Sequence, residues 1–154
     1  MKVRQYANLG FSSQALSPIE INSRLGVEAD RSEVRGSRQA GPPPVPRTHL
    51  WRLNSGVSHE ADLGEHLDAL LPRLAALRDG IARVLADSST TGKLQIVRNF
   101  AAGNEDFDES TYGIDAPGVH RLAGQHPFLG WALAADQLRL IASLGLNLDV
   151  DEYG

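Results

Sequence analysis

The sequence contains no cysteine, which excludes disulfide bonds, thiolate nucleophiles and cysteine metal ligands. This composition fits a reducing compartment, and we expect a cytoplasmic protein. Long apolar runs are also missing: no stretch approaches the ~18 apolar residues that a membrane-spanning helix needs. The first six residues lack the apolar core of a signal peptide. We therefore expect no association with a membrane.

Lysine is scarce, with only Lys2 and Lys93, so most basic residues are arginines, as in proteins from GC-rich bacterial genomes. The formal net charge of -4 argues against a dedicated nucleic-acid-binding protein, because such proteins carry an excess of basic residues to contact phosphate. The sequence also has no Walker loop, dinucleotide fingerprint, nucleophile elbow or metalloprotease motif. These absences favour a non-catalytic protein over an enzyme and predict no cofactor.

What remains is ordinary globular composition, with 42% hydrophobic and 22% charged residues. A chain of 154 residues is typical of a single domain, here expected over 1–154, which buries roughly 70% of the surface of its unfolded chain. Residues 3–11 alternate apolar and polar positions, which predicts a half-buried strand. Ser17, Pro18 and Glu20 then form a capping box that predicts a helix start, and Gly26 predicts its end. A second strand is expected over 49–53, with Trp51 on the core side.

The longest predicted helix covers 62–85, where leucines and other aliphatic residues recur every three or four positions. Pro72 lies inside this pattern and is expected to kink or divide the helix. Further strands are predicted over 93–100, 128–133 and 146–150, with a helix capped by Asp136 before the last of them. Two segments lie outside these elements: a strap over 31–47 rich in proline and arginine, and a long polar excursion over 101–126.

Two distant segments match without gaps, residues 17–30 and residues 136–149. Both segments predict a capped helix that is followed by a glycine and then by a strand with alternating apolar residues. Gly26 aligns with Gly145. We interpret them as two pseudo-repeated βαβ units, although the same local pattern also arises without duplication. The expected fold is therefore α+β, a ferredoxin-like sandwich with a mostly antiparallel sheet and one long helix kinked by proline.

Several of these segments, in this order, resemble a known family. They are the run from Leu25 to Asp30, Arg35-Gly36, the run from Trp51 to Gly56, the leucine-rich helix that opens at Leu63, and the run from Leu144 to Asp151. The sequence resembles the bacterial family catalogued as domain-of-unknown-function family 4279, over nearly the whole chain except the excursion. This resemblance supports the fold and implies no catalytic residues.

The excursion contains the residues best suited to hold a metal. Asn104, Asp106, Asp108 and Ser110 alternate as in a calcium loop, but Glu109 stands where such a loop needs glycine. Histidines His120 and His126 follow, and with Asp106 and Asp108 they form the metal site that we predict. The alternative is a solvated acidic loop with surface histidines.

A partner-binding surface is the other candidate, with one basic part and one acidic part. The basic part is in the strap, where arginine suits bidentate contacts with carboxylate or phosphate. The acidic part is in the excursion. The predicted residues are Arg31, Arg35, Arg38, Arg47, Glu105, Asp106, Asp108 and Glu109. Pairing of these arginines within the chain, with Glu28, Asp30 and Glu33, is the alternative.

Two functions follow from these candidates. The first is a non-catalytic bacterial binding protein whose partner is another protein, for example an immunity-type inhibitor that neutralises a toxin by charge and shape. The second is a small-molecule or metal-binding domain, including a metal-dependent hydrolase, with its site in 101–126. A homodimer joined through open sheet edges is compatible with either.

Overall fold

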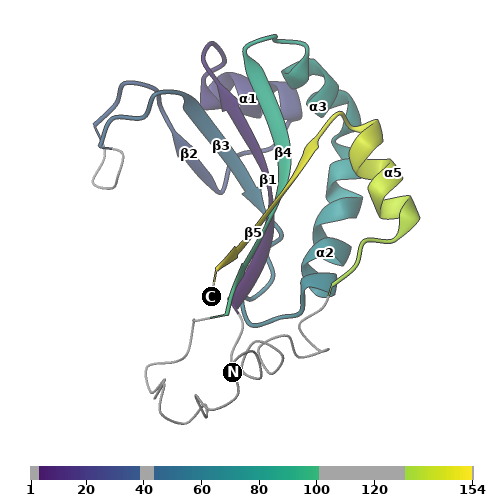
Figure 1. Ribbon diagram of the computed structural model, residues 1–154. Coiled ribbons are helices and arrows are strands. Elements are labelled where there is room, and N and C mark those ends of the chain that lie inside the picture. Colours follow the sequence, from purple (N-terminus) through teal and green to yellow (C-terminus); the bar gives the residue numbers. More distant parts are fainter. Residues whose placement is uncertain (1–3, 39–43, 101–130, 154) are drawn as a thin grey trace, which may run out of the picture.

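The computed structural model describes residues 4–38, 44–100 and 131–153, which form one mixed sheet and a layer of helices (Figure 1). The elements are β1 (Arg4–Ser13), α1 (Pro18–Leu25), β2 (Arg31–Glu33), β3 (His49–Asn54), α2 (Leu63–Ala76), α3 (Arg78–Leu85), β4 (Thr90–Asn99), α5 (Ala135–Ser143) and β5 (Asn147–Tyr153). The five strands lie in the order β2-β3-β1-β4-β5. The fold is therefore α+β, as the sequence predicts.

The sheet is mixed, so the expectation of a mostly antiparallel sheet is wrong. Strand β1 pairs antiparallel with both β3 and β4, and β2 pairs antiparallel with β3, whereas β5 runs parallel to β4. The connection explains this direction. The chain leaves β4 at one end of the sheet and returns through α5 to the opposite end, and a strand that follows such a crossover runs parallel to the one before it.

One face of the sheet packs against the helices, and Figure 1 shows α1, α2, α3 and α5 on that side. Alternate residues of each strand point to this face and are buried, as predicted for Ala7, Leu9 and Phe11 and for Trp51 and Leu53. The leucine stripe of the long helical region is buried there too. None of the described helices crosses the opposite face, which we call the uncovered face. It carries Asn8, Gly10, Ser12, Arg52, Lys93, Gln95, Asn147 and Asp149.

Local signals set the ends of the first helix. The Ser17 amide donates to the Glu20 carboxylate over 2.8 Å, and the Glu20 amide donates to the Ser17 hydroxyl, so the predicted capping box forms. Gly26 ends α1 in the left-handed conformation, with φ of 77°. The cap predicted at Asp136 is wrong, because α5 begins at Ala135. The Ala134 amide donates there to the Gln137 side chain over 2.9 Å, so glutamine supplies the capping contact.

The long helical region is two helices that meet at Leu77, whereas Pro72 lies inside α2. The position of this break follows from tertiary packing. After Leu77 the chain packs on α1, and Gly80 comes so close that a Cβ there would lie 2.9 Å from the Arg24 carbonyl oxygen. A change of helix direction lets α2 pack on β1 and α3 pack on α1.

Two short segments also differ from expectation. Residues 31–33, predicted as part of a strap, form the edge strand β2. Of the strand predicted over 128–133, residues 131–133 are irregular and 128–130 lie outside the described residues. The two helix–glycine–strand units are both present, but β5 lies next to β4 whereas β3 separates β2 from β1. The two halves therefore do not occupy equivalent places in the sheet.

Candidate functional site

The uncovered face has a row of charged residues across its centre. Register places Arg31 beside Arg52, Arg52 beside Gly10, Gly10 beside Lys93 and Lys93 beside Asn147. Cross-strand partners project to the same side of a sheet, so these five residues form one row on the uncovered face. We call it the central row. The row aligns three cationic residues, Arg31 on β2, Arg52 on β3 and Lys93 on β4. Gly10 on β1 lies between Arg52 and Lys93.

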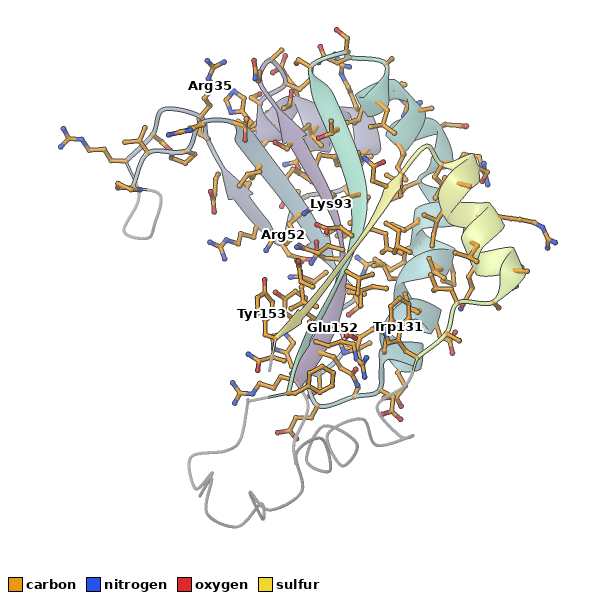
Figure 2. All side chains as sticks on the ribbon, in the orientation of Figure 1. Arg35, Arg52, Lys93, Trp131, Glu152 and Tyr153 are labelled. Carbon is orange, nitrogen blue, oxygen red and sulfur yellow. The ribbon has the colours of Figure 1, made fainter. Side chains whose placement is uncertain are left out.

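A hollow of about 420 Å³ lies over this row and is lined by residues of β1, β3, β4 and β5. Its volume is within the range of small-ligand sites. Gly10 is part of its lining, and the nearest atom that a Cβ on Gly10 would meet is 3.7 Å away. Figure 2 shows Arg52 and Lys93 close to one another at the middle of the sheet. The glycine therefore leaves space between two long cationic side chains.

The three cations of the row differ in their partners. Lys93 forms an ion pair with Asp149 on β5, and Arg31 forms one with Glu33 at 3.1 Å. Within the described residues the guanidinium of Arg52 has no hydrogen bond or ion pair. An arginine that is held in a sheet between other strands and has no intramolecular acceptor is suited to bind an acidic group from outside.

Asn8 lies in the next row, between Asn54 and Gln95. Its side chain is completely buried, yet neither its amide nitrogen nor its amide oxygen has a hydrogen-bond partner among residues 4–38, 44–100 and 131–153. The oxygen lies 3.7 Å from the position of a Cβ on Gly10, although Asn8 is not part of the lining of the hollow. A buried polar group without a partner costs about 1–3 kcal/mol.

The predicted partner-binding arginines are only partly together. Arg31 lies in the central row and pairs with Glu33, as the intramolecular alternative predicts. The guanidinium of Arg35 instead donates to the Gln14 carbonyl over 3.1 Å, and the Arg35 amide donates to the His49 ring. Arg38 and Arg47 are exposed beyond β2.

The predicted metal ligands lie outside the described residues. They are Asp106, Asp108, His120 and His126, and the same holds for the acidic partner-binding residues Glu105 and Glu109. Among residues 4–38, 44–100 and 131–153 no group of three or more His, Asp or Glu side chains could hold a metal. The metal site in the excursion stays a prediction.

A serine and a histidine pair on the helix-covered side, where the sequence indicated no site. The Ser55 hydroxyl and His66 Nδ1 are 2.6 Å apart. His66 is completely buried, whereas its position beside the leucine stripe predicts a half-exposed side chain. That prediction is wrong because α2 packs on β1 and the His66 ring bonds to Ser55. Since both side chains are enclosed in the core, we infer that the pair joins the end of β3 to α2 and does not meet a substrate.

Burial lowers the pKa of His66 from its ordinary value of 6.5, and the charge of nearby His59 adds to this effect. The folded chain therefore holds fewer protons than the unfolded chain just below pH 6.5, and its stability must fall as the pH falls through this range. We expect the free energy of unfolding to drop by up to about 1.4 kcal/mol per pH unit from this group. Urea unfolding at about pH 7.5 and at about pH 5.5 measures this drop in the free energy of unfolding. The variant His66→Gln should lose less stability between the two pH values, and an equal loss would contradict this assignment.

An ion pair between a buried arginine and an exposed glutamate lies at the other end of the sheet, also on the helix-covered side. Arg98 is 5% exposed; it donates to Glu152 over 2.6 Å and lies over the Phe100 ring at 4.8 Å. The indole of Trp131 donates to the same carboxylate over 3.3 Å (Figure 2). These contacts join β4, β5 and the segment before α5. We infer that they hold β5 in place.

The sequence did not indicate that Gly10, Arg52 and Lys93 form a group. The alternation within each strand does place these residues on the polar side. No local signal predicts the register between strands. It is this register that makes Arg52 and Lys93 neighbours of the same glycine, Gly10.

A comparison with protein families identifies the chain. The model of the family described as Domain of unknown function (DUF4279) matches residues 2–154. The chain belongs to the DUF4279 family. The predicted resemblance is thus confirmed over essentially the whole chain. Comparisons of this DUF4279 chain with curated proteins and with solved structures found no match. In the described ranges, no helix combines the length and the apolar character needed to cross a bilayer.

Proposed function

We propose that this DUF4279 chain is a non-catalytic, cytoplasmic binding domain whose uncovered sheet face holds another protein. The observation that carries the proposal is Arg52, a cation beside the hollow of the central row with no acceptor among the described residues. A sheet face that none of the described helices covers presents rigid, regularly spaced side chains, which suits it to recognition. The serine–histidine pair is buried on the opposite side and is unsuited to catalysis at this face.

The net charge of -4 and the basic row act at different distances. Over long range an acidic protein attracts a partner with an excess of positive charge. At contact, Arg52 then requires one acidic group within that partner's surface. An immunity-type inhibitor, which holds a toxin by charge and shape, is the form of binding that we propose.

Charge reversal on the face tests the proposal. We expect the tagged chain, purified from its own cells, to carry a stoichiometric protein partner that native mass spectrometry identifies. Arg52→Glu should lose this partner, because it places an acidic group where the partner presents one. The matched control is Arg139→Glu, the same reversal at an exposed position of α5 on the opposite side of the molecule. Absence of any stoichiometric partner, or equal retention by both variants, would contradict the proposal; a mass of twice the chain would identify a homodimer instead.

We also propose that the two helix–glycine–strand units of the chain are structural repeats of a ferredoxin-like type, although the strand of each unit takes a different place in the sheet. Support comes from Gly26 and Gly145, which end α1 and follow α5 with φ values of 77° and 70°. Both helices pack on the same side of the sheet, and a strand follows each of them (Figure 1).

A further inference from the structure

We propose that the central row binds one oxyanion group, a carboxylate or a phosphate, above Gly10 and between Arg52 and Lys93. This inference rests on the proposed function, because it names the chemical group that the uncovered face takes from its partner. Two alternatives share this chemistry: an acidic side chain of the protein partner, and a small free anion. The experiment below distinguishes them.

The geometry of the row suits a group of this size. Gly10 is the direct neighbour of Arg52 on β3 and of Lys93 on β4. Adjacent strands are about 4.8 Å apart, so the two cationic residues stand about 10 Å apart at their Cα atoms. Both side chains are long enough to reach an anion over the middle strand. The guanidinium offers a planar pair of donors to two oxygens, and the ammonium adds a point charge.

Gly10 leaves the space that the anion needs, and the backbone and packing at this position do not themselves require a glycine. Its φ is not in the left-handed region, and a Cβ there would make only ordinary contacts, the nearest at 3.7 Å. Gly92 on the next strand is different, because a Cβ there would lie 2.8 Å from Leu146 and from Phe11 in the core. A side chain at 92 would therefore displace core side chains, whereas a side chain at 10 would displace nothing in the core and would fill the hollow.

Asn8 lies in the neighbouring row, next to Gly10 but outside the lining of the hollow. Its amide is completely buried and has no hydrogen-bond partner among the described residues, and its oxygen lies 3.7 Å from where a Cβ on Gly10 would stand. The site that we propose therefore consists of Arg52, Gly10 and Lys93, whereas Asn8 lies beneath the adjacent part of the face.

Asp149 limits the affinity of the site. Its carboxylate pairs with Lys93 and lies at the margin of the same hollow, so it competes with an incoming anion for the ammonium. Replacement of Asp149 by asparagine keeps the shape of the side chain and removes this competition. Removal of a negative charge is thus expected to strengthen binding, which a merely structural role of the Lys93–Asp149 pair does not predict.

The test is a titration of the full chain with inorganic phosphate and, separately, with acetate, followed by amide chemical shifts. We expect saturable shifts at Gly10, Arg52 and Lys93. Arg52→Gln and Gly10→Val should each weaken the affinity roughly tenfold or more, as expected for loss of a charged hydrogen bond or of the space. Asp149→Asn should strengthen it several-fold. Arg139→Gln on α5 is the matched control and should bind as the unaltered chain does.

Each outcome has a definite meaning. Tighter binding of phosphate than of acetate identifies a free phosphate or phosphorylated ligand, and the reverse identifies a carboxylate, as on the partner's acidic side chains. No saturable shift in the row, or equal affinity in Arg52→Gln and the unaltered chain, overturns the inference. Thermal unfolding of Gly10→Val excludes loss of folding as the cause. If the protein partner is still lost on Arg52→Glu while no anion binds, the proposed function stands and only the oxyanion site fails.

Discussion

Replacement of Trp51 by alanine is expected to lower the free energy of unfolding by about 3–5 kcal/mol. Trp51 is the largest fully buried side chain of the described core and is 1% exposed. Its ring packs against Phe11 at 5.7 Å between centroids. Its indole nitrogen donates to the Asn22 amide oxygen over 2.6 Å, which joins β3 to α1. The alanine variant leaves a cavity between the sheet and α1 and removes this bond.

Urea unfolding of the variant measures the change as a shift of the midpoint at constant slope. Trp51→Phe should lose distinctly less stability, because it keeps an aromatic ring in the site and loses mainly the hydrogen bond. The Asn22 oxygen then still accepts from the Ala29 amide. The other tryptophan is the matched control: Trp131 is only partly buried, so Trp131→Ala should be milder. A loss below about 1 kcal/mol for Trp51→Ala would contradict the packing described above.

Replacement of Gly80 by alanine is expected to destabilise the protein by about 1–3 kcal/mol, although alanine favours helices more than glycine does. A Cβ at this position would lie 2.9 Å from the Arg24 carbonyl oxygen and 2.9 Å from the Leu25 Cα. Both are backbone atoms, so the conflict is relieved only if α3 moves away from α1. That movement strains the reciprocal bonds in which Arg24 donates to the Arg83 carbonyl and Arg83 donates to the Arg24 carbonyl.

Gly64 provides the control for this substitution. It is also a helical glycine, in α2, but a Cβ there would meet nothing within 4 Å. Gly64→Ala should therefore raise the free energy of unfolding by roughly 0.5–1 kcal/mol through helix propensity alone. Chemical denaturation of both variants measures the difference. Stabilisation by both substitutions would show that α1 and α3 do not approach as closely as described.

The binding face and the core use glycine for different purposes. A Cβ at Gly80 would meet the backbone of α1, and a Cβ at Gly92 would meet the core side chains of Leu146 and Phe11. Gly10 lies on the uncovered face and keeps a hollow open between two cations. We therefore expect that substitutions at Gly10 separate binding from stability, whereas substitutions at Gly80 and Gly92 do not. This contrast allows the proposed binding face to be tested in proteins that remain folded.

The sequence by itself determined the parts of this protein that depend on local interactions. The capping box of Ser17 and Glu20 and the left-handed Gly26 define α1, because their hydrogen bonds and dihedral angles involve neighbouring residues. Alternation in β1 and the leucine stripe of α2 identified which side chains are buried, since burial follows the period of each element. The order of segments also predicted the family.

Only the tertiary structure decided how these elements meet. The parallel direction of β5 follows from a crossover whose path no local pattern encodes, and the break at Leu77 follows from the contact of α3 with α1. The burial of His66 depends on the packing of α2 against β1. The central row depends on register, because Arg52, Gly10 and Lys93 come from three separate strands and become neighbours only when those strands pair. A shift of one residue in either pairing would turn these side chains to opposite faces and remove the site.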